Sequence, residues 1–309
     1  MSRVVFLGPQ RFRPTLAGVL DRFEIEGTVA AVTAGWQERE QEVDELKVHI
    51  HRDLVNLRLY ERTEQVLASD PEFGAALHDK QRRLRDLQKL YRQRLGHTLK
   101  AAREVMCLDG RDAFVREHRQ AAVRAVRTLD RQHLIRVRRI HSEFDEQWVP
   151  ARRPSVASHR RELEDLVAGA SAVAIAGGHV AILVNRLRLF RFAELLAPQT
   201  VVAWSAGAMA LSERVVLFHD RPPQGAGDAE VLDAGLGVVD RIVALPHARR
   251  RLDLEDPVRV ALLARRFAPD LLATLDAGTE LIRDGGRWMP GAGARALTSR
   301  GAVVELKHP

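Results

Sequence analysis

The chain has 309 residues, enough for one large domain or two ordinary ones, and its 46% hydrophobic and 29% charged residues favour a folded globular protein over a disordered one. The single cysteine, Cys107, excludes an internal disulfide bond and predicts a cytoplasmic protein. No apolar run approaches the roughly 18 residues of a membrane-spanning helix, so we expect no membrane partner. The formal net charge of +7 admits a polyanionic partner without identifying one.

The first 36 residues predict a strand, a helix and a second strand. Residues 4–7 form a short apolar run that stops at Gly8 and Pro9. A helical stretch follows, and residues 28–33 are β-branched and apolar. A strand, a helix and a strand in this order are typical of the start of a parallel α/β sheet.

Residues 37–150 have a different texture, with little glycine or proline and apolar residues at helical spacing. Three apolar stripes predict a bundle of three long helices, or a coiled-coil arm, inserted into the α/β domain. Because these stripes exceed what a peripheral hairpin needs to bury, we expect the protein to form a homodimer through the arm.

Charge is segregated within this insert. Acidic residues are in excess over residues 37–79, and basic residues are in excess over residues 80–141. Either an acidic helix packs beside basic ones, or the basic helices present a surface for nucleic acid or another polyanion. The first alternative is favoured because charge runs are usually solvated faces. The arm also lacks the interleaved exposed aromatic residues of a single-strand binder.

The α/β texture returns after residue 150 and continues to residue 309. Buried strands are predicted at residues 172–176, 200–204 and 241–245, and further apolar runs at 271–275 and 302–306 are expected to complete the same sheet. Residues 1–36 and 151–309 therefore predict one discontinuous domain, with residues 37–150 as its helical insertion.

Ser205 lies in a sequence that predicts a sharp strand-to-helix turn. The run Ala203-Trp204-Ser205-Ala206-Gly207 nearly matches Gly-x-Ser-x-Gly, and an apolar strand precedes it. Small residues on both sides of the serine allow the close backbone approach of a nucleophile elbow. Ser205 is therefore the candidate nucleophile, and the first N–H groups of the following helix are candidate oxyanion donors.

Two other strand ends carry residues that suit this chemistry. Gly177 and Gly178 follow one buried strand, where a free amide could supply a second oxyanion donor. His247 follows another strand and can serve as general base to Ser205. The other histidines are scattered, and no phosphate-binding or dinucleotide motif is present, so we expect no metal and no cofactor.

The order of these motifs resembles a known family. Gly-Gly follows one strand, Trp-Ser-Ala-Gly-Ala follows the next, Gly-Leu-Gly stands at 235–237, and Pro-His leads into an arginine-rich segment. This resembles the serine peptidases that include aspartyl dipeptidase and cyanophycinase, which share the class I glutamine amidotransferase-like fold. The resemblance covers residues 1–36 and about 165–285, but not the arm. It implies a three-layer α/β sandwich with a mostly parallel sheet.

The resemblance also implies roles for particular residues. It makes Ser205 the nucleophile and His247 the base, with the oxyanion bound by the amides of Gly178 and Ala206. The family cleaves after aspartyl residues, including β-linked ones, so a small acidic peptide is the expected substrate. Such a substrate requires a cationic pocket. The candidate substrate-binding residues are Gly177, His179, Arg249, Arg250 and Arg251.

The acid of the triad is where the sequence departs from this family. Ala277 stands where cyanophycinase-like members carry glutamate, and the neighbouring Asp276 should face the other way if the strand continues. Asp220, which lies where dipeptidase-like members also have an acid, is narrowly favoured as the residue that orients His247. With this departure, the alternative is a catalytically lapsed scaffold or binding protein whose arm mediates oligomerisation or polyanion contact.

Overall fold

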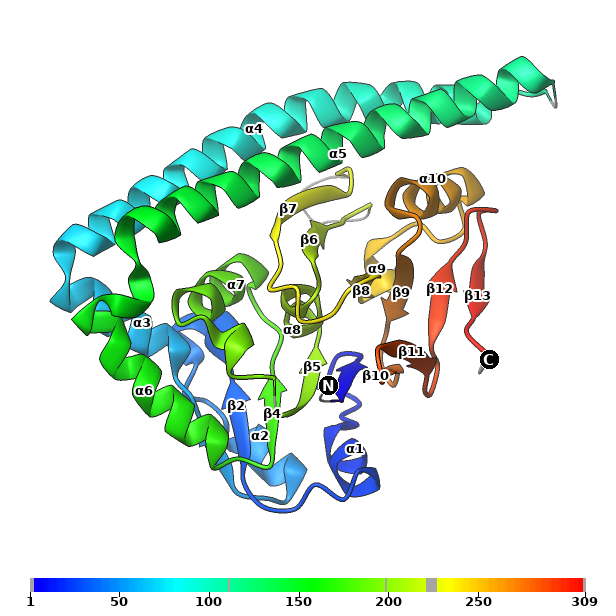
Figure 1. Cartoon of the computed structure of the whole chain (residues 1–309). Coiled ribbons are helices and arrows are strands. Elements are labelled where there is room, and N and C mark those ends of the chain that lie inside the picture. Colours follow the sequence, from blue (N-terminus) through cyan, green and yellow to red (C-terminus); the bar gives the residue numbers. More distant parts are fainter. Residues whose placement is uncertain (1–2, 111, 198, 221–226, 308–309) are drawn as a thin grey trace.

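The chain forms a mixed α/β body with a long helical hairpin lying across it (Figure 1). The computed structural model describes residues 3–110, 112–197, 199–220 and 227–307. The predicted α/β class with a mainly parallel central sheet is confirmed. Across the described part of the chain, no helix combines the length and the apolar character needed to cross a bilayer.

Seven strands of the described chain form the central sheet, in the order β11-β10-β1-β5-β4-β2-β3. These strands are β1 (Val4–Leu7), β2 (Val29–Val32), β3 (Leu54–Asn56), β4 (Ala172–Ile175), β5 (Thr200–Trp204), β10 (Glu280–Asp284) and β11 (Arg287–Pro290). All the pairs from β1 to β3 are parallel, whereas β10 and β11 are antiparallel to their neighbours. The carboxyl ends of β1, β5, β4, β2 and β3 therefore lie along one edge of the sheet.

Helices cover both faces of this sheet. In β1, Phe6 belongs to the apolar core on one face and Val5 to the core on the other, as strand alternation requires. Burial on both faces explains why β1, β2 and β4 are uninterrupted apolar runs. One face is covered by α1 (Leu16–Arg22) and α2 (Asp44–Ile50). The other is covered by α3 (Leu59–Ser69), α6 (Pro154–Ala168), α7 (Val180–Leu189) and α8 (Ala206–Leu211).

The remaining strands do not join the central sheet. Where the sequence predicted that the later apolar runs complete one sheet, four of the described strands form a second sheet in the order β13-β12-β9-β8. The β10–β11 hairpin pairs with β1 and occupies that edge of the central sheet. The further elements are β6 (Arg214–Leu217), β7 (Glu230–Ala234), β8 (Ile242–Pro246), β9 (Leu271–Leu275), β12 (Arg295–Leu297), β13 (Val303–Glu305), α9 (Ala248–Arg251) and α10 (Pro257–Phe267), with short 3₁₀ helices η2 (Pro150–Arg152) and η3 (Phe192–Glu194).

The predicted first long helix is wrong. Residues 34–69 instead form η1 (Ala34–Arg39), α2, β3 and α3, and β3 pairs with β2 in the central sheet. His51 ends α2 in a left-handed conformation, and Arg58 adopts the same conformation immediately before α3. These turns break the apparent helical stripe. The inserted hairpin therefore consists of α4 (Pro71–Cys107) and α5 (Ala113–Trp148).

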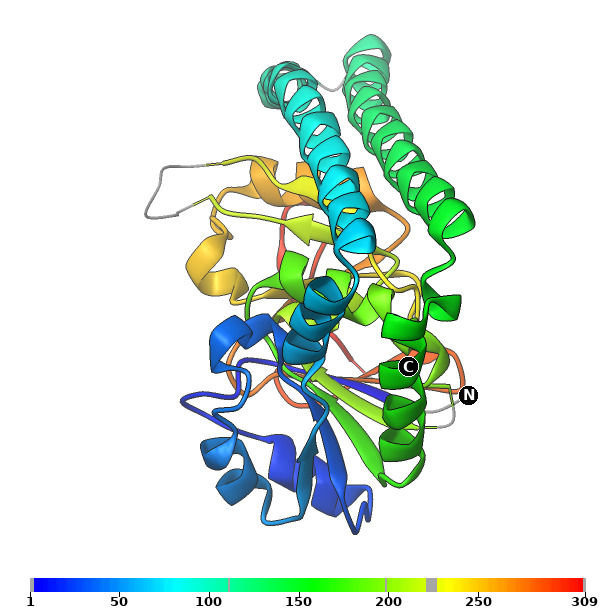
Figure 2. The ribbon, with the colours of Figure 1, turned by 90° about the vertical axis from the view of Figure 1, so that its left-hand side faces the viewer.

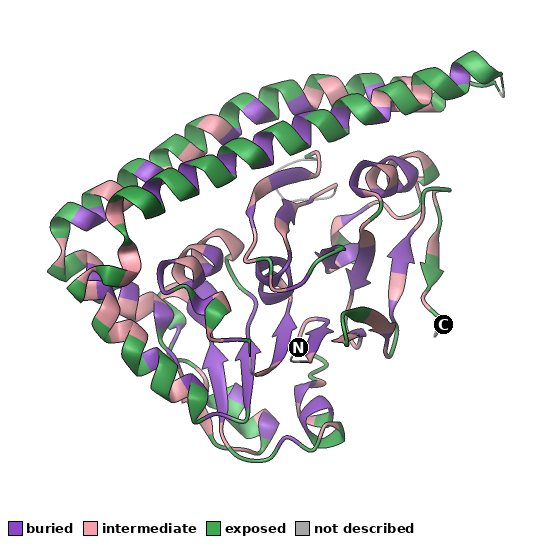
Figure 3. Cartoon of the chain, in the orientation of Figure 1, coloured by how far each residue is buried: buried purple, intermediate pink, exposed green. Residues whose placement is uncertain are grey.

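The hairpin packs against its own body. Figures 1 and 2 show α4 and α5 side by side above β7 and α10, and both helices contact these two elements. Figure 3 shows their buried residues on the sides that face each other and the body. Beneath the hairpin, the buried Arg266 of α10 pairs with Asp130 of α5 at 2.6 Å, and Tyr91 of α4 donates to Asp130 at 2.7 Å. The apolar stripes of α4 and α5 are thus covered largely within one chain.

Candidate active site

Ser205 occupies a strained turn between β5 and α8. Its backbone has φ 51° and ψ −119°, a combination that side-chain-bearing residues rarely adopt. Trp204 ends the strand and Ala206 begins the helix, so the chain reverses within one residue at the carboxyl edge of the sheet. The sequence-predicted position of Ser205, directly between a buried strand and a helix, is confirmed.

Glycines allow neighbouring backbone to approach this turn closely. A Cβ atom on Gly207 would lie 2.3 Å from the carbonyl oxygen of Ile175, so α8 can pack on β4 only because this residue is glycine. A Cβ atom on Gly177 would lie 2.8 Å from the Cβ atom of Ser205. The segment that follows β4 is therefore pressed against the serine itself.

Two backbone amides near Ser205 have no acceptor among the described residues. Ala206 is the first residue of α8, so its N–H group has no acceptor within the helix. The exposed Gly178, with φ 113°, donates no hydrogen bond from its amide to any described residue. The adjoining Gly177 lies beside both Ser205 and the Ala206 amide, which a Cβ atom on it would approach to 3.6 Å. Both amides are available for an anionic oxygen.

His247 follows β8 and is the N-cap of α9. Its amide donates to the carbonyl of Leu275 at 3.1 Å, and β8 packs beside α8, the helix that follows Ser205. Burial, reinforced by the charges of Arg251 and Arg250, lowers the pKa of His247, and the charge of Asp276 opposes this shift. A neutral imidazole at neutral pH is the protonation state that a general base needs. Among the described residues, no hydrogen bond joins its ring to Ser205.

Asp220, predicted to orient His247, is engaged elsewhere. One carboxylate oxygen accepts from the Asp253 amide at 3.0 Å, and the other lies 3.1 Å from the Arg259 guanidinium. No hydrogen bond between described residues joins Asp220 to His247. The loop that carries Asp220 is fixed by the hydrogen bond from its amide to the Arg251 carbonyl, at 2.7 Å, which leaves the carboxylate facing residue 253 and α10.

Asp276 differs from Asp220 in that its charge raises the pKa of His247. If the strand had continued, alternation would have turned the Asp276 side chain away from the site. However, β9 ends at Leu275, and Asp276 begins a turn in which its carbonyl accepts from the Thr279 amide at 3.0 Å. Alternation therefore does not decide its direction. One carboxylate oxygen accepts from the Arg249 amide at 3.1 Å, and the other lies 3.9 Å from the Arg249 guanidinium.

The predicted substrate-binding residues have different surroundings. Arg251 is half-buried, and within the described chain its guanidinium has no acidic partner; burial and the neighbouring Arg250 lower its pKa. An unpaired cation of this kind favours an anionic ligand. Arg249 interacts with Asp276, as described above. His179 caps α7 by accepting from the Ile182 amide at 3.3 Å, which gives it a structural role the sequence did not reveal.

No group of three or more His, Cys, Asp or Glu side chains within the described residues could hold a metal ion. No protein-family model matches this sequence, and no curated protein shows significant similarity to it.

Solved structures do resemble the chain in shape. A peptidase from an acI-B1 Actinobacterium is 12% identical, with 99% of this chain and 97% of that chain covered, at a TM-score of 0.49. A candidate peptidase E from Listeria monocytogenes EGD-e is 9% identical, with 96% of this chain and 100% of that chain covered, at a TM-score of 0.46. Because both TM-scores are below 0.5, the roles of individual residues rest on the geometry of this chain alone.

Proposed function

We propose that the protein is a serine peptidase-like hydrolase with the class I glutamine amidotransferase-like three-layer fold, acting on small acidic peptides with Asp-X or β-aspartyl bonds. One observation carries the proposal. Ser205 stands in a strained strand-to-helix turn, with Gly177 against its side chain and the unpaired amide of Ala206 next to it. Residues held in such sparsely populated conformations cluster at active sites, so the turn at Ser205 supports a catalytic role.

The proposed reaction is acyl transfer through Ser205. Its Oγ attacks the scissile carbonyl while His247 accepts the hydroxyl proton. The amides of Gly178 and Ala206 bind the oxygen of the tetrahedral intermediate. As the C–N bond breaks, His247 returns the proton to the leaving amine. Water then attacks the acyl-enzyme while His247 accepts its proton, and His247 returns that proton to the Ser205 Oγ as the ester bond breaks.

The charges near His247 support an acidic substrate. Arg251 and Arg250 place two cations near the base, and within the described chain neither has an acidic partner. The carboxylate of an aspartyl residue would pair with these guanidinium groups. Asp276 replaces Asp220 in the proposal as the acid that stabilises the imidazolium, because its charge favours the protonated form of His247.

The decisive experiment is reaction with an uncharged fluorophosphonate probe, together with hydrolysis of aspartyl and β-aspartyl dipeptides compared with their asparaginyl counterparts. We expect Ser205 to be labelled and the aspartyl peptides to be cleaved preferentially. A protein inert toward the probe and toward all of these peptides would contradict the proposal and favour a lapsed scaffold.

The pH dependence of labelling should distinguish the two acids. Labelling requires neutral His247, so the rate falls as the pH drops through the pKa of this histidine, which lies below its usual 6.5. Arg251→Ala removes a cation that lowers this pKa, so the acidic limb should move to higher pH. Asp276→Asn removes an anion that raises it, so the limb should move to lower pH.

Asp220→Asn is the matched control for Asp276→Asn, because Asp220 makes no hydrogen bond with His247 among the described residues and is not one of the charged groups that shift its pKa. The acidic limb of its labelling rate against pH should coincide with that of the wild type. A shift in this variant, with none in Asp276→Asn, would restore Asp220 as the acid partner.

We also propose that the protein forms a homodimer through the arm. With its inner face packed on the body, the arm offers only its outer face and tip, where Leu108 and Phe114 are 54% and 62% exposed. We expect dimers in sedimentation at micromolar concentration, and monomers for the Leu108→Ser, Phe114→Ser double variant. A monomeric wild type would contradict this proposal.

A further inference from the structure

Gln37 has nearly the same backbone conformation as Ser205. It lies within η1 at φ 60° and ψ −126°, against φ 51° and ψ −119° for the serine. By contrast, His51 and His247, which also have positive φ, lie in the ordinary left-handed region with ψ near 35°. A non-glycine residue held outside the favoured regions costs on the order of 1–3 kcal/mol, and glycine would relieve most of that cost.

The segment that carries Gln37 is anchored before and after it. On one side, the carbonyl of Gly35 accepts from the His179 amide at 2.7 Å, and a Cβ atom on Gly35 would lie 2.5 Å from the Gly177 carbonyl oxygen. The chain two residues before Gln37 is thus tied to the glycine segment that borders Ser205.

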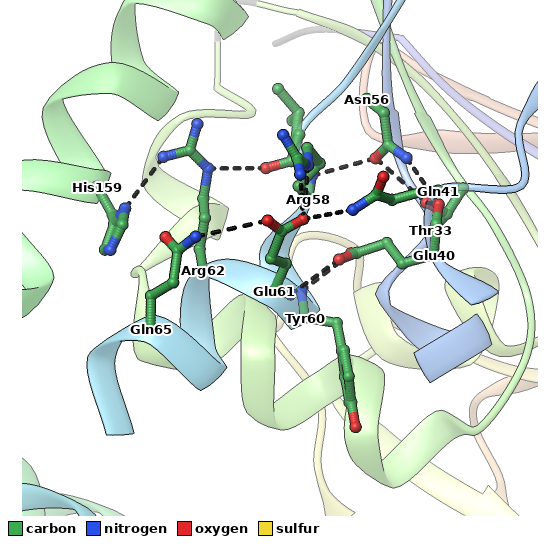
Figure 4. Close-up of polar contacts among 11 residues, drawn as sticks. Thr33, Glu40, Gln41, Asn56, Arg58, Tyr60, Glu61, Arg62, Gln65 and His159 are labelled. Carbon is green, nitrogen blue, oxygen red and sulfur yellow. Dashed lines mark hydrogen bonds and ion pairs between the residues drawn. The ribbon is translucent and has the colours of Figure 1, made fainter. Parts of the chain in front are cut away.

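On the other side, Glu40 holds the segment against β3 and α3 (Figure 4). This glutamate is 2% exposed, and its carboxylate accepts from the amides of Tyr60 and Glu61 at 2.9 and 3.0 Å. Its carbonyl accepts from Thr33 at 2.8 Å and from Asn56 at 2.7 Å. Contacts at both ends therefore fix the conformation of Gln37, which is how such strain persists.

The side chain of Gln37 has no internal role that accounts for this cost. It is half-buried and makes no hydrogen bond with any described residue. Its carbonyl accepts from the Glu40 amide, a contact that glycine would keep. What glycine would lose is the half-buried side chain, whose amide offers one donor group and one acceptor group.

The sheet order places Gln37 near the candidate active site. It lies on the segment that follows β2, and β4 separates β2 from β5, so the strand ends that lead to the two strained residues are two strands apart on the same edge. Two strand spacings amount to about 10 Å. Gly177 and Gly178 follow the strand between them. An extended peptide that crosses these glycines from Ser205 would reach Gln37 after about three residues, at about 3.3 Å per residue.

We propose that Gln37 is a substrate-positioning residue whose side-chain amide hydrogen-bonds a peptide group of the substrate, about three residues from the scissile bond. This inference rests on the proposed function and extends it, because it makes acidic oligopeptides the substrates, beyond dipeptides. A peptide group presents one N–H and one C=O, which are complementary to the groups of a glutamine amide.

The test compares two substrate lengths. Gln37→Met keeps the length of the side chain and the strain but removes the amide. It should raise KM about tenfold for tetrapeptides extended on either side of an Asp-Leu bond, as expected for one lost hydrogen bond, with kcat little changed. The Asp-Leu dipeptide does not reach Gln37, so its kcat/KM and the rate of probe labelling should stay within twofold of wild type.

Gln37→Gly separates this role from a structural one. It should show the same loss on tetrapeptides while melting at a higher temperature than the wild type, because glycine relieves the strain. The matched control is Glu24→Gly, an exposed residue with φ 51° that precedes β2 at the opposite edge of the sheet. It should gain stability and leave both activities unchanged.

The outcomes are distinguishable from failure of the proposed function. Equal losses on dipeptide and tetrapeptide, no loss on either, or a wild type that cleaves only dipeptides would each overturn the role of Gln37 while leaving Ser205 as nucleophile. A wild type that neither reacts with the probe nor cleaves any peptide would overturn both proposals.

Discussion

Ser205→Ala is expected to abolish covalent labelling and to lower peptide turnover by several orders of magnitude, to the background that binding and the oxyanion donors supply without a nucleophile. The physical reason is that only the Ser205 hydroxyl can form the acyl bond. The substitution removes one oxygen atom from a side chain that makes no hydrogen bond with the described residues, so folding should be unaffected. Active-site labelling, turnover and thermal melting measure these three quantities.

Ser158→Ala is the matched control, because this exposed hydroxyl lies on α6 and donates to the Pro154 carbonyl at 3.2 Å. It should leave labelling and turnover unchanged. His247→Ala should lower both by orders of magnitude while leaving Ser205 in place. Full turnover by Ser205→Ala would show that the hydrolysis belongs to another group or to a contaminant, and the acyl-enzyme mechanism would be wrong.

Asp130→Ala is expected to cost about 3–5 kcal/mol of stability, because it leaves the buried Arg266 beneath the hairpin without an anionic partner. Arg266 is 3% exposed, and its guanidinium donates to Asp130 at 2.6 and 2.8 Å and to the Tyr91 hydroxyl at 3.0 Å. Without the carboxylate, Arg266 keeps only neutral acceptors. Denaturant unfolding should show the loss, and proteolysis should show whether α4 and α5 detach from the body.

The control is Glu143→Ala, which removes an exposed hairpin ion pair with Arg83 at 2.8 Å and should cost no more than about 1 kcal/mol. The double variant Asp130→Leu, Arg266→Met replaces the buried charges with apolar groups and should recover much of the stability. If Asp130→Ala costs no more than Glu143→Ala, the buried pair does not hold the hairpin on the body.

The sequence by itself determined the elements whose signals are local. The apolar runs of β1, β2, β4 and β5 predicted buried parallel strands, because strands covered on both faces have no polar alternation. The small residues around Ser205 predicted its turn, since only such residues permit the close contact between α8 and β4. The apolar stripes of α4 and α5 likewise predicted two of the helices in the insert.

Other features depended on contacts that no local pattern encodes. Residues 43–57 have an apolar spacing that suits a helix, yet β3 forms there because β2 offers a free strand edge. A short apolar run of this kind is ambiguous between helix and strand until its neighbour is known. The later strands form a second sheet, and the β10–β11 hairpin occupies the edge of the central sheet beside β1.

The surroundings of the two candidate acids and the conformation of the strained glutamine also depended on tertiary structure. Asp220 and Asp276 are both aspartates after apolar runs, and what separates them is that Arg259 and the Asp253 amide engage the first, while the charge of the second acts on His247. The backbone conformation of Gln37 has no sequence signal, because glutamine does not favour it. It is imposed by contacts on either side, where Gly177 packs against Gly35 and the buried carboxylate of Glu40 accepts from amides in the first turn of α3.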